Sequence, residues 1–411
     1  MKKQRLLLFL LAAVNFTHIT DLVLLIPLQP TLMTLWKINA KQFGIVMAAY
    51  TLAAAVSSLI ATYFIDRHDR RPVMLITFGG FILGTFACAF APGYLPMVAA
   101  RAVTGFFGGM IGALVLAIVS DCYPIQERGR AMGVITGALA VAFILGIPMG
   151  MVLADTFDWH APFYFLAGFG ALIWLALLKI MPSMKGHTVE GAVRSGLIST
   201  LDRALRDKNQ RKALALAGLL ILSAVMIITF LPIYLARNVG LTETHMQYLL
   251  FAAGGITIVA SAVIGKLTDR FGPMKVFLGL VVGSLVPIWA VTSMPAVGWG
   301  LALLAVASFF VFVLGQLVPA QTIITGAVGP GHRGSFMSLK SAVQQFAASI
   351  GAFAGGAIMT NQFTKQAAKA GEALPLENFE RVGYVAIVLC LLGVLIARNL
   401  KEADGNREIV S

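Results

Sequence analysis

The sequence predicts an all-α integral membrane protein in which twelve transmembrane helices form two pseudo-symmetric six-helix bundles. This prediction rests on the composition, on the lengths of the apolar runs and on an internal repeat. Of the 411 residues, 58% are hydrophobic and only 12% are charged, and the mean hydropathy is +0.86. Because a soluble domain carries charge on about a quarter of its residues, this composition places most of the chain in a lipid bilayer.

Apolar runs of about 18 to 30 residues recur along the chain, which suits helices that cross a hydrocarbon core of roughly 30 Å. Barrel strands would instead be alternating segments of about ten residues. The first run follows a basic N-terminus but has no small-residue cleavage site, so we expect an uncleaved span rather than a signal peptide. The expected spans are 6–35, 43–65, 72–91, 95–120, 131–154, 160–181, 212–236, 246–268, 273–292, 297–325, 335–359 and 382–400.

The distribution of Lys and Arg predicts the orientation. If both termini are cytoplasmic, 23 of the 31 Lys and Arg residues lie on the cytoplasmic side and six on the opposite side. The net charge of +13 then reflects topology and attraction to anionic lipid heads rather than binding to nucleic acid. We expect a monomer in a bacterial inner (plasma) membrane, with lipids and a small-molecule substrate as partners.

Neither a metal site nor a bound cofactor is expected. The cysteines, Cys88, Cys122 and Cys390, lie in two spans and a loop and do not have the spacing of metal ligands. The pattern of an ATP-binding P-loop is absent. ATP hydrolysis within this chain is therefore not expected as an energy source.

The two halves of the chain repeat each other. The longest polar stretch, 182–211, separates an N-terminal bundle, 1–181, from a C-terminal bundle, 212–411. Asp66-Arg67 aligns with Asp269-Arg270 at an offset of 203, and Arg128-Gly129 aligns with Arg333-Gly334 at an offset of 205. Two separate matches at nearly one offset indicate a duplicated scaffold.

The repeated loop resembles the signature of the major facilitator superfamily, roughly Gly-x-Leu-Ala-Asp-Arg-x-Gly-Arg-Lys. The second copy has Gly265, Leu267, Asp269, Arg270 and Gly272, whereas in the first copy Thr62 and Asp69 replace the two glycines. The resemblance covers essentially the whole chain and implies the twelve-helix fold of that family. It also implies a cytoplasmic gating latch made of Asp66, Arg67, Arg70, Asp269 and Arg270, with Arg128 and Arg333 as partners. The alternative is that these charges only enforce topology.

Two further patterns narrow the resemblance to the drug:proton antiporter and sugar-efflux-like branch. Arg101 and Gly105 are similar to the Arg-x-x-x-Gly pattern of proton-coupled members, and Gly108 and Gly112 lie on the same helical face as Arg101. That smooth face allows a neighbouring backbone to approach closely. The second pattern looks like the glycine-proline signature of exporters and implies a hinge or seal. It consists of Gly146, Pro148 and Gly150, although Ile147 separates the usual Gly-Pro pair. The alternative is an ordinary transmembrane kink.

Asp21 is the most informative single residue. A carboxylate at the centre of a membrane helix costs about 2.5 to 3.5 kcal/mol on insertion scales, so it indicates a functional site. Thr17 and His18 share its helix face. The repeat aligns Pro27 with Pro232 but places no acidic residue opposite Asp21. The carboxylate therefore belongs to the first bundle alone.

We expect Asp21 to be the proton-coupling site, with Arg101 as its modulator. Desolvation favours the protonated carboxyl, whereas a nearby arginine favours the ionised form. Arg101 lies about 9 Å inside its span, which brings it within reach of Asp21. His18 either shares the proton or bonds a neighbouring carbonyl. The alternative for Asp21 is a buried hydrogen bond that only stabilises helix packing.

Other polar residues within spans are candidates for a substrate cavity shared by both bundles. For Lys340, about 9 Å inside its span, snorkelling to the membrane surface is preferred over binding of an anionic substrate. The candidates are Asn15, Thr17, Gln316, Gln321, Gln344, Gln345 and Lys340.

The expected function is proton-coupled export of a small amphipathic or mildly polar solute by alternating access, and the chain is not expected to be an enzyme. The first alternative is a proton symporter or facilitator that imports a nutrient or a lipid-like solute. The second is a membrane enzyme or sensor that does not transport. No role is assigned to the outer loop 360–381.

Overall fold

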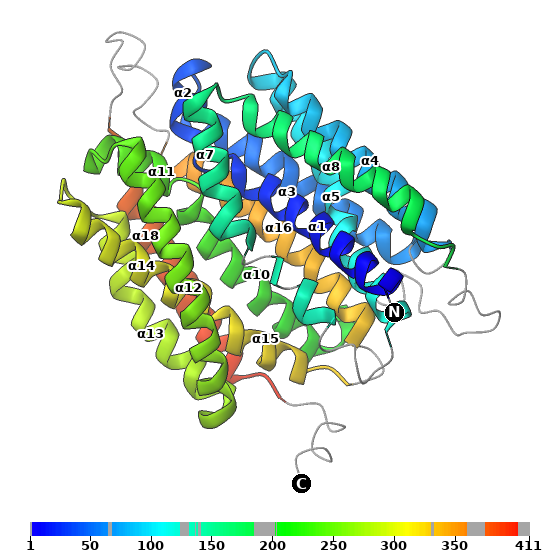
Figure 1. The fold of residues 1–411 in the computed structure, drawn as a ribbon. Helices are drawn as coiled ribbons and strands as arrows, with labels where there is room; N and C mark the ends of the chain where they lie inside the picture. The colour runs from blue at the N-terminus through cyan, green and yellow to red at the C-terminus, as the bar shows by residue number, and fades with distance from the viewer. Residues whose placement is uncertain are drawn as a thin grey trace. The chain divides into compact units, whose positions relative to one another are not determined.

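The computed structural model describes residues 2–64, 68–123, 131–135, 137–138, 141–184, 202, 204–329, 333–359 and 375–401. All regular structure in these residues is helical (Figure 1), which confirms the predicted all-α class. Within them, 11 helical segments are long and apolar enough to cross a membrane, and they correspond to every expected span except the fifth. The fifth span, 131–154, lies partly outside the described residues.

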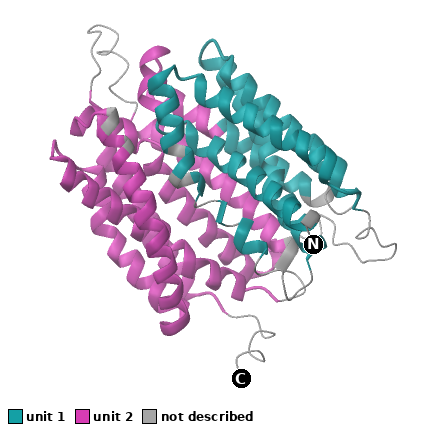
Figure 2. Ribbon diagram, viewed as in Figure 1, with its two compact units in different colours: residues 1–28, 49–197 teal, residues 29–48, 198–411 magenta. Residues whose placement is uncertain are grey.

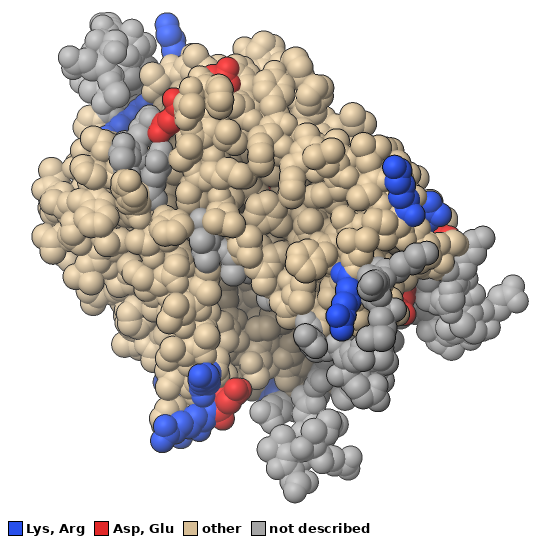
Figure 3. Space-filling model, in the orientation of Figure 1, with Lys and Arg blue, Asp and Glu red and all other residues tan. Residues whose placement is uncertain are grey.

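Exposed apolar side chains support the membrane assignment. Phe9, Leu83 and Val286 are 75%, 70% and 70% exposed, which would be unfavourable in water but suits contact with lipid tails. Figure 3 shows that most of the described surface on the drawn face carries no charged side chain. An uncharged surface is what contact with lipid tails requires.

The chain divides into two compact units (Figure 2). Unit 1 comprises Met1–Leu28 and Ala49–Leu197, and unit 2 comprises Gln29–Ala48 and Ile198–Ser411. The later boundary falls inside the stretch 182–211 that the sequence predicts as the linker. The grouping of residues 29–48 with unit 2 is a feature that the repeat does not predict.

In unit 1, α4 packs against α5 and α8, and α1 packs against α5 and α8. Its core is an aliphatic and aromatic cluster that includes Leu11, Phe78, Phe81, Ile118 and Leu177. The elements of this unit are α1 (Lys2–Leu24), the later part of α3 (Ala40–Phe64), α4 (Arg70–Ala89), α5 (Tyr94–Cys122), the π-helix η1 (Ala142–Gly146), α7 (Ile147–Thr156) and α8 (Ala161–Ile180).

In unit 2, α10 packs against α16 and α18, and α14 packs against α12 and α13. The elements are α2 (Gln29–Leu35), the beginning of α3, α10 (Lys208–Ile228), α11 (Leu231–Tyr234), the π-helix η2 (Leu235–Val239), α12 (Glu243–Phe271), α13 (Pro273–Thr292), α14 (Trp299–Gly315), α15 (Leu317–Gly326), α16 (Arg333–Met359) and α18 (Phe379–Arg398).

Three expected spans are interrupted rather than continuous. In the first, α1 ends at Leu24 and α2 begins at Gln29, and the residues between them, with Pro27, form a turn. The seventh span breaks between α10 and α11, immediately before Pro232, and the tenth breaks at Gln316 between α14 and α15. A proline has no N–H and clashes with the preceding turn, so it interrupts the helical hydrogen bonds. Pro27 and Pro232, which the repeat aligns, therefore mark equivalent breaks in the two halves.

Gly272 makes the tight connection between α12 and α13. Its φ is 85°, its N–H donates to the Thr268 carbonyl at 3.0 Å, and Pro273 is the first residue of α13. A side chain would strain this left-handed backbone, so glycine is required here. This glycine of the loop signature thus has a local structural role.

Candidate functional site

Asp21 and Arg101 form a buried ion pair in unit 1. Asp21 lies on α1 and Arg101 on α5, the distance between Nη1 and Oδ2 is 2.7 Å, and both side chains have an exposed fraction of 0%. Arg101 Nη1 also donates to the Asp21 backbone carbonyl at 3.4 Å. From α4, Thr85 Oγ1 donates to Asp21 Oδ1 at 3.1 Å. Three helices therefore fix this carboxylate.

The Tyr50 ring on α3 covers the guanidinium of Arg101, and the distance from Arg101 Cζ to the ring centroid is 4.2 Å. Such a cation–π contact stabilises a desolvated guanidinium. Arg101 thus has a carboxylate as its hydrogen-bond acceptor and an aromatic face beside it. The pair is nearly neutral as a whole, which makes its burial tolerable.

Glycines on α5 allow this approach of α3. A Cβ at Gly105 would collide with the Tyr50 backbone carbonyl, and a Cβ at Gly109 would collide with that of Ala54. The sequence places Gly105, Gly108 and Gly112 on the face of Arg101 as a contact surface. Gly105 and Gly108 make such contacts, whereas a Cβ at Gly112 would meet nothing within 4 Å.

Several polar atoms around the ion pair have no hydrogen-bond partner among the residues that the structure describes. These atoms are both ring nitrogens of His18, the Tyr50 hydroxyl, Thr20 Oγ1, and Nε and Nη2 of Arg101. A Cβ at Gly108 would meet both the Tyr50 hydroxyl and the His18 ring, so these two groups face the same small space. Unused donors and acceptors at this depth are suited to water, a proton or a polar substrate group.

His18 lies near the ion pair, but in the described residues its ring nitrogens make no hydrogen bond to Asp21 or Arg101. Its ring stands edge-on to Phe81 with a centroid distance of 5.9 Å, and it is 9% exposed. Thr17, on the same helix face, uses its hydroxyl to bond the Ala13 carbonyl of its own helix at 2.8 Å. Asn15 instead donates to the Ile135 carbonyl at 3.1 Å, so it joins α1 to the segment 131–135.

Sequence reasoning missed four side chains of this cluster. Thr85 and Tyr50 contact the ion pair directly, while Cys88 lies 3.7 Å from the Thr104 hydroxyl, which itself bonds the Ala100 carbonyl. None of them carries charge, and Thr, Tyr and Cys are common in membrane helices. The glycine face of α5 is the signal that could have directed attention to the α3 residues opposite it.

Unit 2 holds a different polar group. Lys340 on α16 is 9% exposed, and its Nζ donates to Gln321 Oε1 on α15. The Gln321 amide nitrogen in turn lies 3.7 Å from Met337 Sδ. The burial of Lys340 and its bond to a neutral acceptor on a neighbouring helix favour an internal position of the ammonium over the expected snorkelling to the membrane surface.

In the part of the chain that the structure describes, no hydrogen bond links Lys340 to the other candidate glutamines. Gln316 is 0% exposed at the α14–α15 break and contacts Cys390 Sγ at 3.9 Å, and its Oε1 has no partner in the described part of the chain. Gln344 and Gln345 are half-buried on α16. Gln344 lies one helical turn beyond Lys340 and shares its face of α16, whereas Gln316 lies at the α14–α15 break.

The structure describes only part of the expected gating latch. Asp66, Arg67 and Arg128, and the side chain of Arg333, lie outside the described residues. Arg70 Nε donates to Asp121 Oδ2 at the end of α5, at 3.1 Å. At the other loop, Asp269 and Arg270 are exposed, and Arg270 lies over the Phe271 ring at 5.2 Å.

Asp69, where the family signature has glycine, caps α4. Its Oδ1 accepts from the Arg71 N–H at 3.0 Å and from the Met184 N–H at 2.8 Å, and its Oδ2 accepts from the Ser183 hydroxyl. A carboxylate at this position satisfies otherwise unpaired N–H groups of the helix end. The departure from the signature thus stabilises the junction between α4 and the end of α8.

Gly146, Pro148 and Gly150 lie where π-helix η1 passes into α7. A Cβ at Gly146 would lie 2.6 Å from Thr20 Oγ1, and a Cβ at Gly150 would collide with Leu24 Cδ1. Pro148 is near the beginning of α7. These glycines therefore permit close packing against α1, whereas hinge movement itself remains a prediction.

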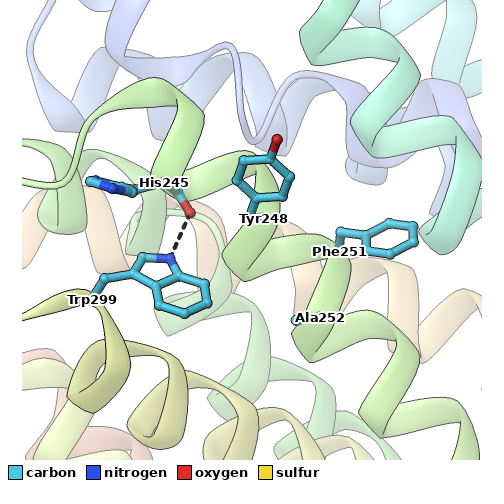
Figure 4. Close-up of a pocket in the computed structure, with 5 residues that line it drawn as sticks. All are labelled: His245, Tyr248, Phe251, Ala252 and Trp299. Carbon is cyan, nitrogen blue, oxygen red and sulfur yellow. Dashed lines mark hydrogen bonds between the residues drawn. The ribbon is translucent and has the colours of Figure 1, made fainter.

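An open apolar groove of about 450 Å³ lies on unit 2, between the beginnings of α12 and α14 (Figure 4). His245, Tyr248, Phe251, Ala252 and Trp299 line it, and Trp299 Nε1 donates to the His245 carbonyl at 3.2 Å. The sequence does not predict this groove. Aromatic side chains near helix ends are typical of the membrane–water boundary, so we assign it no substrate role.

Comparison with known proteins places this geometry in context. The family model described as Major Facilitator Superfamily matches residues 11–227 and 213–408. An uncharacterized MFS-type transporter, YceJ of Bacillus subtilis (strain 168), is 26% identical over 348 residues, which are 84% of this chain and 86% of that protein.

Solved structures agree on the fold. An inward-facing, unoccupied bacterial homolog of the human lysosomal transporter Spinster aligns with a TM-score of 0.80 at 15% identity, over 97% of this chain and 98% of that one. A D-xylose-proton symporter aligns with a TM-score of 0.76 at 15% identity, over 98% of both chains. At this identity the likeness shows the fold alone.

Proposed function

Since the chain belongs to the Major Facilitator Superfamily and is an integral membrane transporter, we propose that it is a proton-coupled exporter of a small amphipathic or mildly polar solute. Two bundles working by alternating access would carry the solute. Family membership favours this function over the enzyme or sensor alternative. The Lys and Arg asymmetry supports an orientation with both termini cytoplasmic, in a bacterial inner membrane.

The observation that carries the proposal is the buried pair of Asp21 and Arg101. Protonation of Asp21 would remove the counter-charge of Arg101, and an unpaired buried charge is unfavourable by about 3 to 5 kcal/mol. The protonated and ionised states therefore favour different packing of α1 against α5. A proton that changes helix packing is what a proton-driven conformational cycle needs.

The unpartnered atoms beside the pair support the same mechanism. His18 and the Tyr50 hydroxyl face one space near Gly108, and Arg101 Nε and Nη2 have no partner in the described residues. When the site opens to water on one side, these groups would receive the water that delivers or removes the proton. We propose His18 as a group that shares this proton path.

Infrared difference spectroscopy tests the proton site without requiring a known substrate. On acidification, the wild-type protein is expected to gain the C=O band of a protonated buried carboxyl, and Asp21→Asn is expected to lose that band. Glu380→Gln is a matched control, because Glu380 lies at the beginning of α18 in unit 2. An unchanged band in Asp21→Asn would contradict the assignment.

A transport assay then tests coupling. Proteoliposomes containing an internal pH dye would be presented with antibiotics, sugars, amino acids and lysolipids, and a transported solute should move protons in the wild type. Asp21→Asn is expected to abolish proton movement driven by that solute. Full proton-driven turnover by this variant would disprove coupling through Asp21.

Uptake by proton symport is the second candidate, and the incomplete exporter signature around Gly146 favours keeping it in the test. The same ion pair serves either direction, since it binds a proton and not a solute. In everted vesicles with an acid interior, an exporter raises the internal pH when its solute is added outside. A symporter instead carries protons out together with solute loaded inside.

A further inference from the structure

Lys340 is a buried cation for which the described residues supply no buried counter-charge. It is 9% exposed on α16, and the acceptor of its ammonium is the neutral Oε1 of Gln321 on α15. No carboxylate pairs with it among the residues that the structure describes. Arg101, by contrast, has Asp21 at 2.7 Å.

The sequence itself excludes an acidic partner over a long stretch. There is no Asp or Glu between Asp269 and Glu372, so α13, α14, α15 and α16 contain none. The helix α10, which packs against α16, also contains none. The described acidic residues of unit 2 lie at or beyond the ends of its helices. The charge of Lys340 therefore lacks an opposite charge in the spans around it.

An unpaired ammonium in a membrane helix is unfavourable, and such residues mark functional sites. A lysine ammonium has three N–H donors. Gln321 accepts one of them, and no further acceptor is found for the others in the described residues. Two donors of a desolvated cation are thus available to a ligand with strong acceptors.

We propose that Lys340 and Gln321 bind the anionic group of the transported solute. The group is a carboxylate or a phosphate, because both present several acceptor oxygens to a lysine and accept charge-assisted hydrogen bonds. Gln321 holds the ammonium and supplies a neutral amide beside it. This inference rests on the proposed transport function, and it assigns the solute a negative charge that composition alone did not predict.

Three variants separate the charge of Lys340 from its packing. Lys340→Met removes the ammonium and keeps an unbranched side chain, whereas Lys340→Arg keeps the charge. Gln321→Glu leaves Lys340 in place but gives it an internal carboxylate that competes with the ligand. Binding of an anion should therefore survive in Lys340→Arg and fail in both Lys340→Met and Gln321→Glu.

Ligand-induced thermal shifts in nanodiscs measure this binding with defined probes. Each anionic probe is paired with an uncharged relative: 1-naphthoate with 1-naphthamide, octanoate with octanamide, and phenyl phosphate with phenol. In the wild type, at least one anion should stabilise the protein more than its uncharged relative. In Lys340→Met and Gln321→Glu, its affinity should fall about tenfold or more, as expected for loss of a hydrogen bond to a charged group.

Each outcome decides the inference. A preference for anions that persists in Lys340→Met, or a wild type that binds none of the three anions in preference to the uncharged relatives, would overturn it. Preference for the phosphate or for a carboxylate identifies the anionic group. Because this readout requires no proton movement, the inference can fail while coupling through Asp21 stands, and coupling can fail while anion binding stands.

Discussion

Arg101 and Lys340, two buried cations of this transporter, differ in how their charge is balanced. In unit 1, Arg101 is completely buried and forms an ion pair with Asp21. The Tyr50 ring lies against its guanidinium. In unit 2, Lys340 is bonded to the neutral Gln321, and the neighbouring stretch of sequence contains no acid. The first site is complete as a neutral pair, whereas the second carries a net positive charge.

This difference indicates two different tasks. A neutral pair changes its net charge when a proton binds, so it is suited to sensing protons. A lone cation attracts an anion from solution and is less favourable without one, so it is suited to binding a charged solute. The duplicated scaffold would thus place proton handling in one half of the sequence and solute charge recognition in the other.

Removal of Arg101 is the change with the largest expected effect on this comparison. Arg101→Met leaves Asp21 as an unpaired buried carboxylate, and the free energy of unfolding should fall by about 3 to 5 kcal/mol. Thermal unfolding of the purified protein in one detergent measures the loss as a lower Tm.

The double variant Asp21→Asn with Arg101→Met is the control, because it removes both charges. Its Tm should recover most of the loss. If Arg101→Met alone unfolds at the wild-type temperature, the two charges are not coupled. Arg101 then does not differ from Lys340 in having its charge balanced by a carboxylate.

Removal of Lys340 should act in the opposite direction. Lys340→Met takes away a lone buried charge whose insertion costs about 2.5 to 3.5 kcal/mol, so the Tm in the absence of ligand should stay or rise. The same thermal unfolding experiment measures it, with Lys340→Arg as the charge-preserving control. A clear fall in Tm for Lys340→Met but not for Lys340→Arg would indicate a stabilising partner for the ammonium and would make the two sites alike.

Much of the fold follows from the sequence because the length of each apolar run is a local property that predicts a membrane-spanning helix. The helix breaks at Pro27 and Pro232 were not predicted, although both prolines were visible and aligned. The apolar runs continue through them, and run length alone does not report backbone geometry. Likewise, the grouping of residues 29–48 with unit 2 depends on tertiary contacts, such as the approach of Gly44 to Ala352.

The candidate site was predictable only where a residue is unusual for a membrane helix. Asp21 and Arg101 stand out as charges, and the structure places them in contact. Thr85 and Tyr50 could not be chosen from the many similar residues in the spans. For Lys340, depth in the span was known, but the choice between snorkelling and burial depended on Gln321 on another helix.

The hydroxyl of Thr85 sharpens the comparison further, because unit 1 supplies its carboxylate with a neutral donor as well as a cation. Thr85→Val removes the hydrogen bond to Asp21 Oδ1 while keeping the shape of the side chain. A hydrogen bond to a charged group contributes about 1.5 to 3 kcal/mol, so the Tm should fall measurably. Thr85→Ser retains the hydroxyl and should stay closer to the wild type. Equal Tm values for the Val variant and the wild type would show that Arg101 alone stabilises the carboxylate.

The smallest expected effect tests whether helix packing creates the burial of the pair. Gly105→Ala places a methyl group against the Tyr50 backbone, so α3 must move away from α5 and withdraw the Tyr50 ring from Arg101. Overpacking of this kind lowers the free energy of unfolding by about 1 to 3 kcal/mol.

Gly112→Ala is a matched control on the same helix, since its Cβ would meet nothing within 4 Å. Alanine favours a helix over glycine by up to about 1 kcal/mol. Thermal unfolding should therefore separate the two alanines in opposite directions. If they are equivalent, close packing of α3 on α5 does not hold Arg101 in its buried position, and the contrast with Lys340 rests on the Asp21 carboxylate alone.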